Sequence, residues 1–158
     1  MKQIRSHSLL LLLLAVVLFG CGEKPLFEKV YSFENRVWTL DQKPEFKLEV
    51  TDTTALYDIS LTLRTTTDYK FNNLWIFLNT TLPDGQSERL PFQIRISNED
   101  GSWIGNKTGS VVETSLDFPA RKLPVKGEYS FIVEQAVTQS QVDEVLDIGL
   151  RVNKTVLP

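Results

Sequence analysis

The only cysteine of the chain, Cys21, ends the tetrapeptide Leu18-Phe19-Gly20-Cys21, where its thiol is placed for acylation. Lys2 and Arg5 lie near the start, and an unbroken apolar run over residues 9–19 follows them. A basic head, a short apolar middle and a small residue before the break are typical of a cleaved secretory signal. The cysteine at the break predicts a lipoprotein signal peptide over residues 1–20. We expect a diacylglycerol on the Cys21 thiol and a further acyl chain on the freed amine, because two or more chains give stable anchoring.

Two other interpretations of this start fit less well. A transmembrane helix needs about 20 apolar residues, and residues 9–19 supply eleven. An ordinary cleaved signal would leave Cys21 as an unpaired thiol in an oxidising compartment. Phe19 is bulkier than the residue usually found two places before such a cysteine, whereas Leu18 and Gly20 fit the pattern.

Removal of the signal also excludes several kinds of chemistry. His7 is the only histidine and leaves with residues 1–20, so the mature chain has no imidazole for a catalytic triad, a general base or a metal site. Acylation of Cys21 excludes thiolate catalysis and thiolate zinc sites. The signal takes two positive charges from a chain of net charge −3, so the mature chain carries −5. We therefore expect no cofactor and no nucleic-acid partner.

Carboxylates are the remaining candidates for catalysis. A paired-carboxylate hydrolase needs two acids that converge across a cleft, and proximity along the chain is weak evidence for that. Surface acids are common in a domain of this charge, so we expect no catalytic residue. The acids that cluster in the sequence are Asp143, Glu144 and Asp147, and Glu113 with Asp117.

Residues 98–101, Asn-Glu-Asp-Gly, resemble the start of a calcium loop. They lack the alternating oxygen ligands and the distant closing glutamate that such a loop requires. We expect no metal site here.

Aromatic side chains offer a surface for recognition. Most of the three tryptophans and four tyrosines are expected in the core, including Trp75, which lies inside an apolar run. Trp103, between Gly101 and Gly105, is expected to be the most exposed. We predict a protein-binding surface formed either by a sheet face or by the loops around Trp103 and around Glu134 and Gln135.

The elements that position these residues are predicted to be strands. Apolar residues alternate with polar ones over residues 46–50, 57–64, 92–96, 129–133 and 146–152, which indicates strands with one face on a core. The inward positions of the last strand are Leu146, Ile148, Leu150 and Val152. Residues 74–78 are apolar on both faces, as in a central strand covered on both sides.

Turns and edges separate these strands. Pro83 and Gly85 in residues 82–85 predict a tight reversal into the next strand. The charged, proline-bearing residues 88–91 are typical of a protected sheet edge. Residues 138–144 allow one helical turn.

The pattern predicts an all-β protein: a single antiparallel β-sandwich of seven or eight strands, with no internal repeat and no disulfide. Residues 1–20 are the signal peptide, residues 21–26 the lipidated N-terminus and a short tether, and residues 27–158 the sandwich. The 138 residues left after cleavage are enough for one domain with a sizeable core.

Several segments together resemble the gliding-motility lipoprotein GldH family of the Bacteroidota, from about Phe27 to Lys154. The likeness lies in their order and spacing behind the signal sequence. The segments are residues 27–38, 57–59 with 63–64, 68–74, 81–85, 100–105, 132–136 and 146–152. After Ala136 the family often has a Met-Arg pair and an acidic or proline-bearing loop, whereas residues 137–143 here are Gln- and Val-containing.

The resemblance implies a non-enzymatic envelope lipoprotein that is needed for gliding, in bacteria whose gliding apparatus is tied to type IX secretion. Its implied partners are the lipid of the membrane and other proteins of the gliding machinery. Gly22, rather than aspartate, follows Cys21, which favours the outer membrane. The alternative is a carbohydrate-binding envelope lipoprotein that grips glycans through Trp103.

Overall fold

The computed structural model describes residues 24–156, which form eleven strands and one 3-10 turn. Within this range, no helix has the length and apolar character to span a membrane. Seven or eight strands were expected, and the additional ones are three residues long, too short to show a period of two. The elements are β1 Phe27–Ser32, η2 Glu34–Arg36, β2 Val37–Thr39, β3 Glu45–Val50, β4 Leu56–Thr66, β5 Asn73–Thr81, β6 Ser87–Arg95, β7 Asn106–Thr108, β8 Val111–Lys122, β9 Gly127–Gln135, β10 Gln141–Asp143 and β11 Val145–Lys154.

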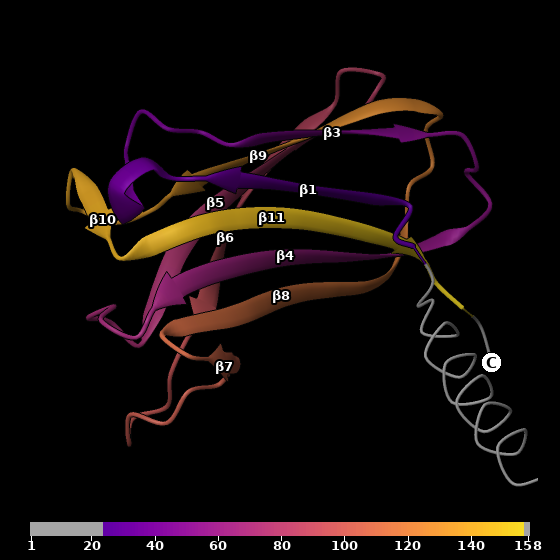
Figure 1. The fold of residues 1–158 in the computed structure, drawn as a ribbon. Coiled ribbons are helices and arrows are strands. Elements are labelled where there is room, and N and C mark those ends of the chain that lie inside the picture. Colours follow the sequence, from indigo (N-terminus) through magenta and orange to yellow (C-terminus); the bar gives the residue numbers. More distant parts are fainter. Residues whose placement is uncertain (1–23, 157–158) are drawn as a thin grey trace, which may run out of the picture.

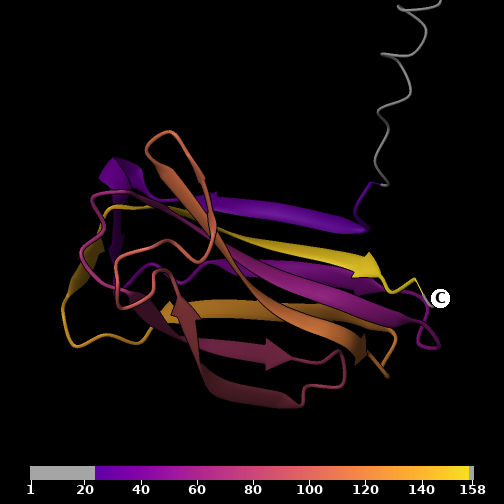
Figure 2. The same cartoon turned by 90° about the horizontal axis from the view of Figure 1, so that it is seen from below.

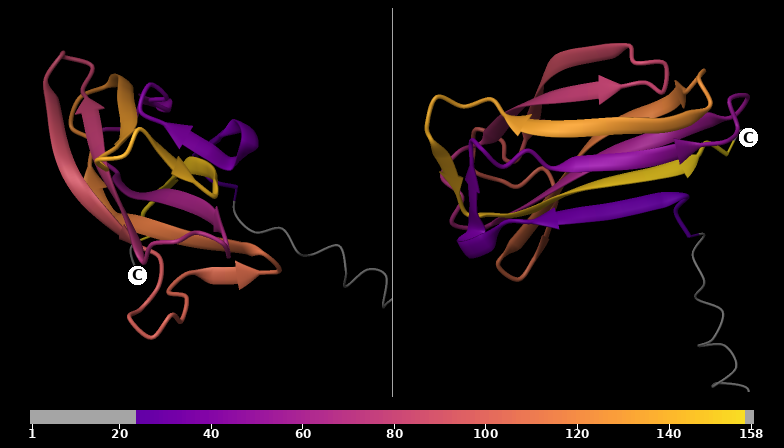
Figure 3. Two further views of the ribbon diagram at one scale, coloured as in Figure 1. Left: turned by 90° about the vertical axis from the view of Figure 1, so that its left-hand side faces the viewer. Right: turned by 90° about the horizontal axis from the view of Figure 1, so that it is seen from above.

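The strands form two facing sheets, which confirms the antiparallel sandwich (Figure 1). One sheet has the order β1-β11-β4-β8-β7 and the other the order β3-β9-β5-β6. Every pair in them is antiparallel. A small sheet of β10 and β2 lies at one end. The layers are seen end-on and from above in Figure 3.

The core fills the space between the sheets. Tyr57, Ile59, Leu61 and Leu63 on β4 are at most 6% exposed, so the predicted inward face of this strand is confirmed. The inward positions of β3 and β9 are also buried as predicted. They are Phe46, Leu48 and Val50, and Tyr129, Phe131 and Val133. Full burial of one such side chain contributes about 1.5–3 kcal/mol, so the alternation along each strand accounts for the stability of the sandwich.

The start of β1 and the end of β11 lie at the same end of the sandwich, which we call the terminal end (Figures 1 and 2). Phe27 pairs with Val152, and Lys154 pairs with Tyr57 near the start of β4. The opposite end, which we call the far end, carries the β4–β5 and β9–β10 loops and the small sheet.

Two predictions near the far end were wrong. Leu146 is not fully buried, because the register shifts between Val145 and Asp147 and makes Leu146 an extra residue in β11. Val145 takes the buried position instead, at 0% exposed. Residues 138–144 contain no helical turn; Val142 pairs with Trp38 in the small sheet.

The prediction that residues 74–78 are covered on both faces was also wrong. Leu74 and Ile76 are buried, but Trp75 is 45% exposed because no layer covers the outer face of the four-stranded sheet. Phe77 on the same face is half-buried, with the guanidinium carbon of Arg89 3.5 Å from its ring centroid. A cation over the ring face, rather than a second layer of protein, covers Phe77.

The predicted turn and edge are both confirmed. The amide of Gly85 donates to the carbonyl of Leu82 at 2.9 Å, and Gly85 has a φ of +85°, which glycine adopts without strain. This hairpin leads into β6, which pairs only with β5 and is the edge of its sheet.

Candidate interaction surface

Gln135 does not belong to a surface. Its side chain is 5% exposed, and Nε2 donates to the backbone carbonyl of Trp38 at 2.9 Å. Because side chains alternate along a strand, Gln135 faces the interior whenever Glu134 faces outwards. Gln135 therefore links the small sheet to β9, and its assignment to a binding surface was wrong.

Trp103 lies far from Glu134. It is half-buried against the core and bridges to Ser97, so the most exposed tryptophan is Trp75 instead. Glu134 pairs with Phe77, which pairs with Pro91. Ser97 lies six residues beyond Pro91, or about 20 Å at the usual rise of a strand. The structure therefore does not unite Trp103 and Glu134 in one surface.

Glu134 is the centre of an ion network on the outer face of the four-stranded sheet. Its Oε1 accepts from Lys43 Nζ at 3.3 Å and from Asn79 Nδ2 at 3.1 Å. Its Oε2 accepts from Arg89 Nη2 at 3.1 Å. Burial acts to raise the pKa of Glu134, but the hydrogen bonds from Arg89 and Lys43 outweigh it and the pKa lies below its ordinary value. The carboxylate is therefore charged and held in place by residues from three different segments.

Two exposed aromatic residues lie beyond this network, toward the far end. Trp75 shares the outer face with Phe77 two positions later, and Phe71, in the β4–β5 loop, is 49% exposed. Trp75 and Phe71 line a shallow hollow of about 280 Å³, together with Val137 and Gln139 of the β9–β10 loop. We call the set Trp75, Phe71, Glu134, Arg89 and Lys43 the far-end surface.

The polar residues near Trp75 in the sequence indicate that this side of β5 faces solvent. Asn73, Asn79 and Thr81 share its phase along β5, and polar residues at that phase indicate a solvent-facing side of the strand. The intervening Phe77 obscured the pattern, because it made the run look apolar on both faces.

Three of the clustered acids are engaged in structural contacts. Asp147, 5% exposed, accepts two hydrogen bonds from Arg64 at 2.8 and 2.6 Å. Glu144 pairs with Arg36 at 3.2 Å. Asp117 accepts hydrogen bonds from two serine hydroxyls, those of Ser60 at 2.6 Å and Ser115 at 2.9 Å.

The Asn98–Gly101 segment forms a turn that its own groups close. The amide of Gly101 donates to the Asn98 carbonyl at 3.0 Å, and the amide of Ser102 donates to Asp100 Oδ1 at 2.9 Å. The Ser102 hydroxyl also donates to Asp100 Oδ1, at 2.6 Å, and this bond together with that from the Ser102 amide holds the pKa of Asp100 below its ordinary value. Over residues 24–156, no group of three or more His, Cys, Asp or Glu side chains is arranged to hold a metal ion. Cys21, the predicted lipidation site, lies outside the described residues.

The fold and this surface define a class of protein: a β-sandwich domain whose outer sheet face carries an aromatic and charged patch. The chain belongs to the GldH lipoprotein family, whose sequence profile matches residues 25–152. It is 29% identical to "Gliding motility lipoprotein GldH" of Flavobacterium johnsoniae over 156 residues, which cover 94% of this chain and 97% of that protein. It is 24% identical to "Gliding motility lipoprotein GldH homolog" of Christiangramia forsetii over 159 residues, or 95% of this chain and 97% of that protein.

Solved structures with a similar arrangement are more distant. A carbohydrate-binding module specific for non-crystalline cellulose, CBM28, has a TM-score of 0.49 at 8% identity, covering 82% of this chain and 73% of that chain. The sugar-binding C-terminal domain of EclA has a TM-score of 0.33 at 16% identity, covering 87% and 83%. Neither likeness supports a conclusion about what this chain binds.

Proposed function

We propose that this protein is a lipid-anchored, non-enzymatic component of the gliding machinery or of its assembly, linked to type IX secretion. Its family membership and the names of its relatives support the motility role. The exposed pair Trp75 and Phe71, beside the fixed charges of Glu134 and Arg89, is the observation that carries the mode of action. The protein acts by contact with other envelope proteins through the far-end surface.

The composition of the far-end surface supports a protein partner. Exposed apolar patches with a polar rim mark interaction sites, and tryptophan and arginine are the residues that most often dominate the binding energy of an interface. Here Trp75 is the aromatic anchor, while Lys43, Arg89 and Glu134 form the charged rim. Because their ion pairs are already formed, a partner meets a preorganised surface.

The lipid anchor proposed at Cys21 determines how far this surface lies from the membrane. Five residues lie between Cys21 and Phe27, so an acylated Cys21 holds the terminal end within about 20 Å of the membrane surface. The ten residues of β11 span about 34 Å from one end of the sandwich to the other. Trp75 and Phe71 therefore lie toward the end of the domain that is remote from the membrane, in the outer membrane location that Gly22 favours.

Deletion and complementation test this proposal. A strain without the protein should fail to spread on agar, and the wild-type gene should restore spreading. The Trp75→Ala variant should reach normal levels in the membrane fraction and yet restore little or no spreading. Tyr31→Ala, which removes a 38% exposed aromatic side chain from the other sheet, is the matched control and should restore spreading. Normal spreading by the deletion strain would contradict the motility role.

A second candidate function is glycan binding, favoured by one observation. The hollow beside Trp75 is also lined by Asn73, Thr138 and Gln139, whose polar groups suit hydroxyls of a sugar stacked on the indole. Retardation of the protein in a gel that contains glycans, lost on Trp75→Ala, would support this function. Equal mobility with and without glycans would leave protein contact as the role of the surface.

A further inference from the structure

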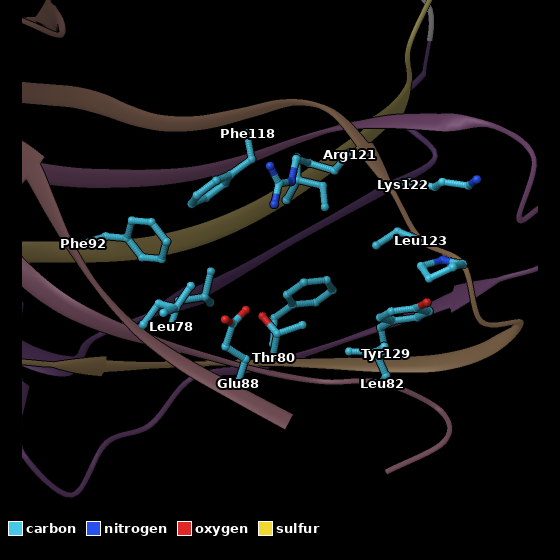
Figure 4. Close-up of a pocket in the computed structure, with 14 residues that line it drawn as sticks. Leu78, Thr80, Leu82, Glu88, Phe92, Phe118, Arg121, Lys122, Leu123 and Tyr129 are labelled. Atoms are coloured by element: carbon cyan, nitrogen blue, oxygen red, sulfur yellow. The ribbon is translucent and has the colours of Figure 1, made fainter. Parts of the chain in front are cut away.

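A cavity of about 240 Å³ lies between the two sheets toward the terminal end, on the inner side of the four-stranded sheet (Figure 4). Its walls are mostly apolar and come from both sheets. They include Leu78, Leu90, Phe92, Phe118, Leu123 and Phe131. The volume is just below the 300–1,000 Å³ of pockets for drug-sized ligands, so the cavity suits one slender chain.

The cavity exists because two edge strands diverge. On β6, exposure of the inward side chains rises along the strand from 1% at Ile94 to 41% at Leu90. On β8, Val112 is fully buried while Phe118 is half-buried. The rings of Phe92 and Phe118 meet edge to face at 5.1 Å between centroids. Beyond that contact the sheets separate toward the terminal end, and the apolar interior opens to solvent.

A bulge in β8 turns a cation into this opening. Tyr57 pairs with Arg121 and Ile59 with Phe118, so one residue of β4 faces two of β8. Ala120 in the bulge has a φ of +51°, which is unfavourable for a residue with a side chain. Its amide donates to Asp58 Oδ1 at 2.8 Å, which stabilises this backbone. As a result Arg121 lies on the inward side, and its guanidinium points into the cavity while the amine of Lys122 points away (Figure 4).

The charged side chains at the mouth of the cavity are not neutralised by ion pairs with the described residues. Within the part of the chain that the structure describes, no ion pair joins Arg121, Lys122 or Glu88 to another residue. Arg121 lies on one lip and Glu88 on the other. An apolar chain with a phosphate and an amine at its head matches an apolar cavity with a guanidinium on one lip and a carboxylate on the other.

An added peptide strand fits the same edges poorly. Pro91 on β6 and Pro119 on β8 have no amide hydrogen to donate, and proline on an edge strand blocks strand addition. An inward-pointing charge such as Arg121 also protects an edge from aggregation, which is the purely structural role it would have without a ligand.

We infer that the cavity binds one acyl chain of an amine-containing phospholipid, with the phosphate at Arg121 and the amine at Glu88. The membrane location of the cavity rests on the lipid anchor proposed at Cys21, because the terminal end is the end that this anchor holds near the bilayer. The bound lipid fixes the orientation of the domain on the membrane, in addition to the flexible tether.

Photocrosslinking in cells tests the inference on the full chain. Cells are fed a clickable fatty acid with a photoreactive group, irradiated, and the protein is digested with trypsin. Label on the N-terminal peptide without irradiation reports the anchor at Cys21. Label that requires irradiation, on the peptide from Leu90 to Arg95 and with the mass of a phospholipid, reports the cavity.

The variant Arg121→Gln should lower the irradiation-dependent label at least fivefold and leave the anchor label unchanged. Lys107→Gln, which removes an exposed cation at the β7–β8 hairpin, should change neither. Three results would overturn the inference: no irradiation-dependent label on this peptide, an adduct with the mass of a free fatty acid, or equal label in wild type and Arg121→Gln. Loss of the anchor label alone would contradict the proposed anchor and not the cavity.

Discussion

The two ends of the sandwich differ in where they leave apolar side chains accessible. At the far end the interior is closed: Trp38, in β2 of the small sheet, is fully buried and stacks on Phe33 at 4.8 Å between ring centroids. Trp75 and Phe71 are exposed there on the outside of the molecule. At the terminal end the interior itself is accessible, through the gap between β6 and β8.

This difference follows from how each end is covered. The β10–β2 sheet and the Gln135 hydrogen bond close the far end, whereas β8 pairs with β7 only through residues 111–113 and is otherwise an open edge. A broad, flat aromatic patch suits a protein surface, and a narrow gap suits a single chain. One sandwich therefore has two recognition regions of different kinds, one on the outer face of the four-stranded sheet and one between the two sheets.

The largest effect is expected from loss of the lipid anchor, because the anchor holds both ends of the sandwich in a fixed position relative to the membrane. Cys21→Ser removes the acyl acceptor, so the protein should carry no acyl label and should be released or mislocalised. Spreading should then be lost even though both ends are intact. Acyl labelling and fractionation measure this result, and unchanged membrane retention without label would refute the anchor.

A stability comparison sharpens the contrast between the closed and the open end. Trp38→Ala should lower the free energy of unfolding by about 3–5 kcal/mol, because it leaves a large cavity under the small sheet. Phe118→Ala should cost only about 1–2 kcal/mol, since that side chain is already partly exposed to water. Urea unfolding of both variants measures the difference. Equal losses would mean that the terminal end is closed in solution.

The smallest expected effect concerns the ion network of the far-end surface. The pKa of Glu134 is lowered from 4.5 in the folded protein, so its charged form stabilises the fold above about pH 4.5 and this contribution is lost as the pH falls through the folded pKa. Glu134→Gln should cost no more than about 1 kcal/mol at pH 7. The difference from wild type should shrink as the pH falls below 4.5. A difference that does not change as the pH falls would show that packing, and not charge, is the role of Glu134.

Much of the fold was predictable from the sequence because burial imposes a period of two. The alternation in β3, β4 and β9 gave the correct inward residues, and Pro83 with Gly85 gave the correct hairpin. Leu146 was misplaced because the bulge at Val145–Asp147 depends on pairing with β4, which is distant in the chain. The bulge at Ala120, which turns Arg121 inwards, likewise depends on the side chain of Asp58.

The candidate site was less predictable. Glu134 was expected at the surface and is there, but its partners Lys43 and Arg89 come from segments 91 and 45 residues away. The prediction for Gln135 was wrong because neighbouring residues of a strand point to opposite faces, so Glu134 and Gln135 do not share one surface. Trp75 was assigned to the core because hydrophobicity alone does not show that one sheet face lacks a covering layer.

The most direct test of two distinct recognition regions is site-specific photocrosslinking in living cells. A photoreactive amino acid replaces the exposed Gln139, which lines the hollow beside Trp75, in one strain and Leu90 in another, within the full-length protein. We predict that the Gln139 position captures a discrete protein partner and that the Leu90 position captures lipid. A protein partner captured at Leu90 and not at Gln139 would contradict the presence of two distinct recognition regions.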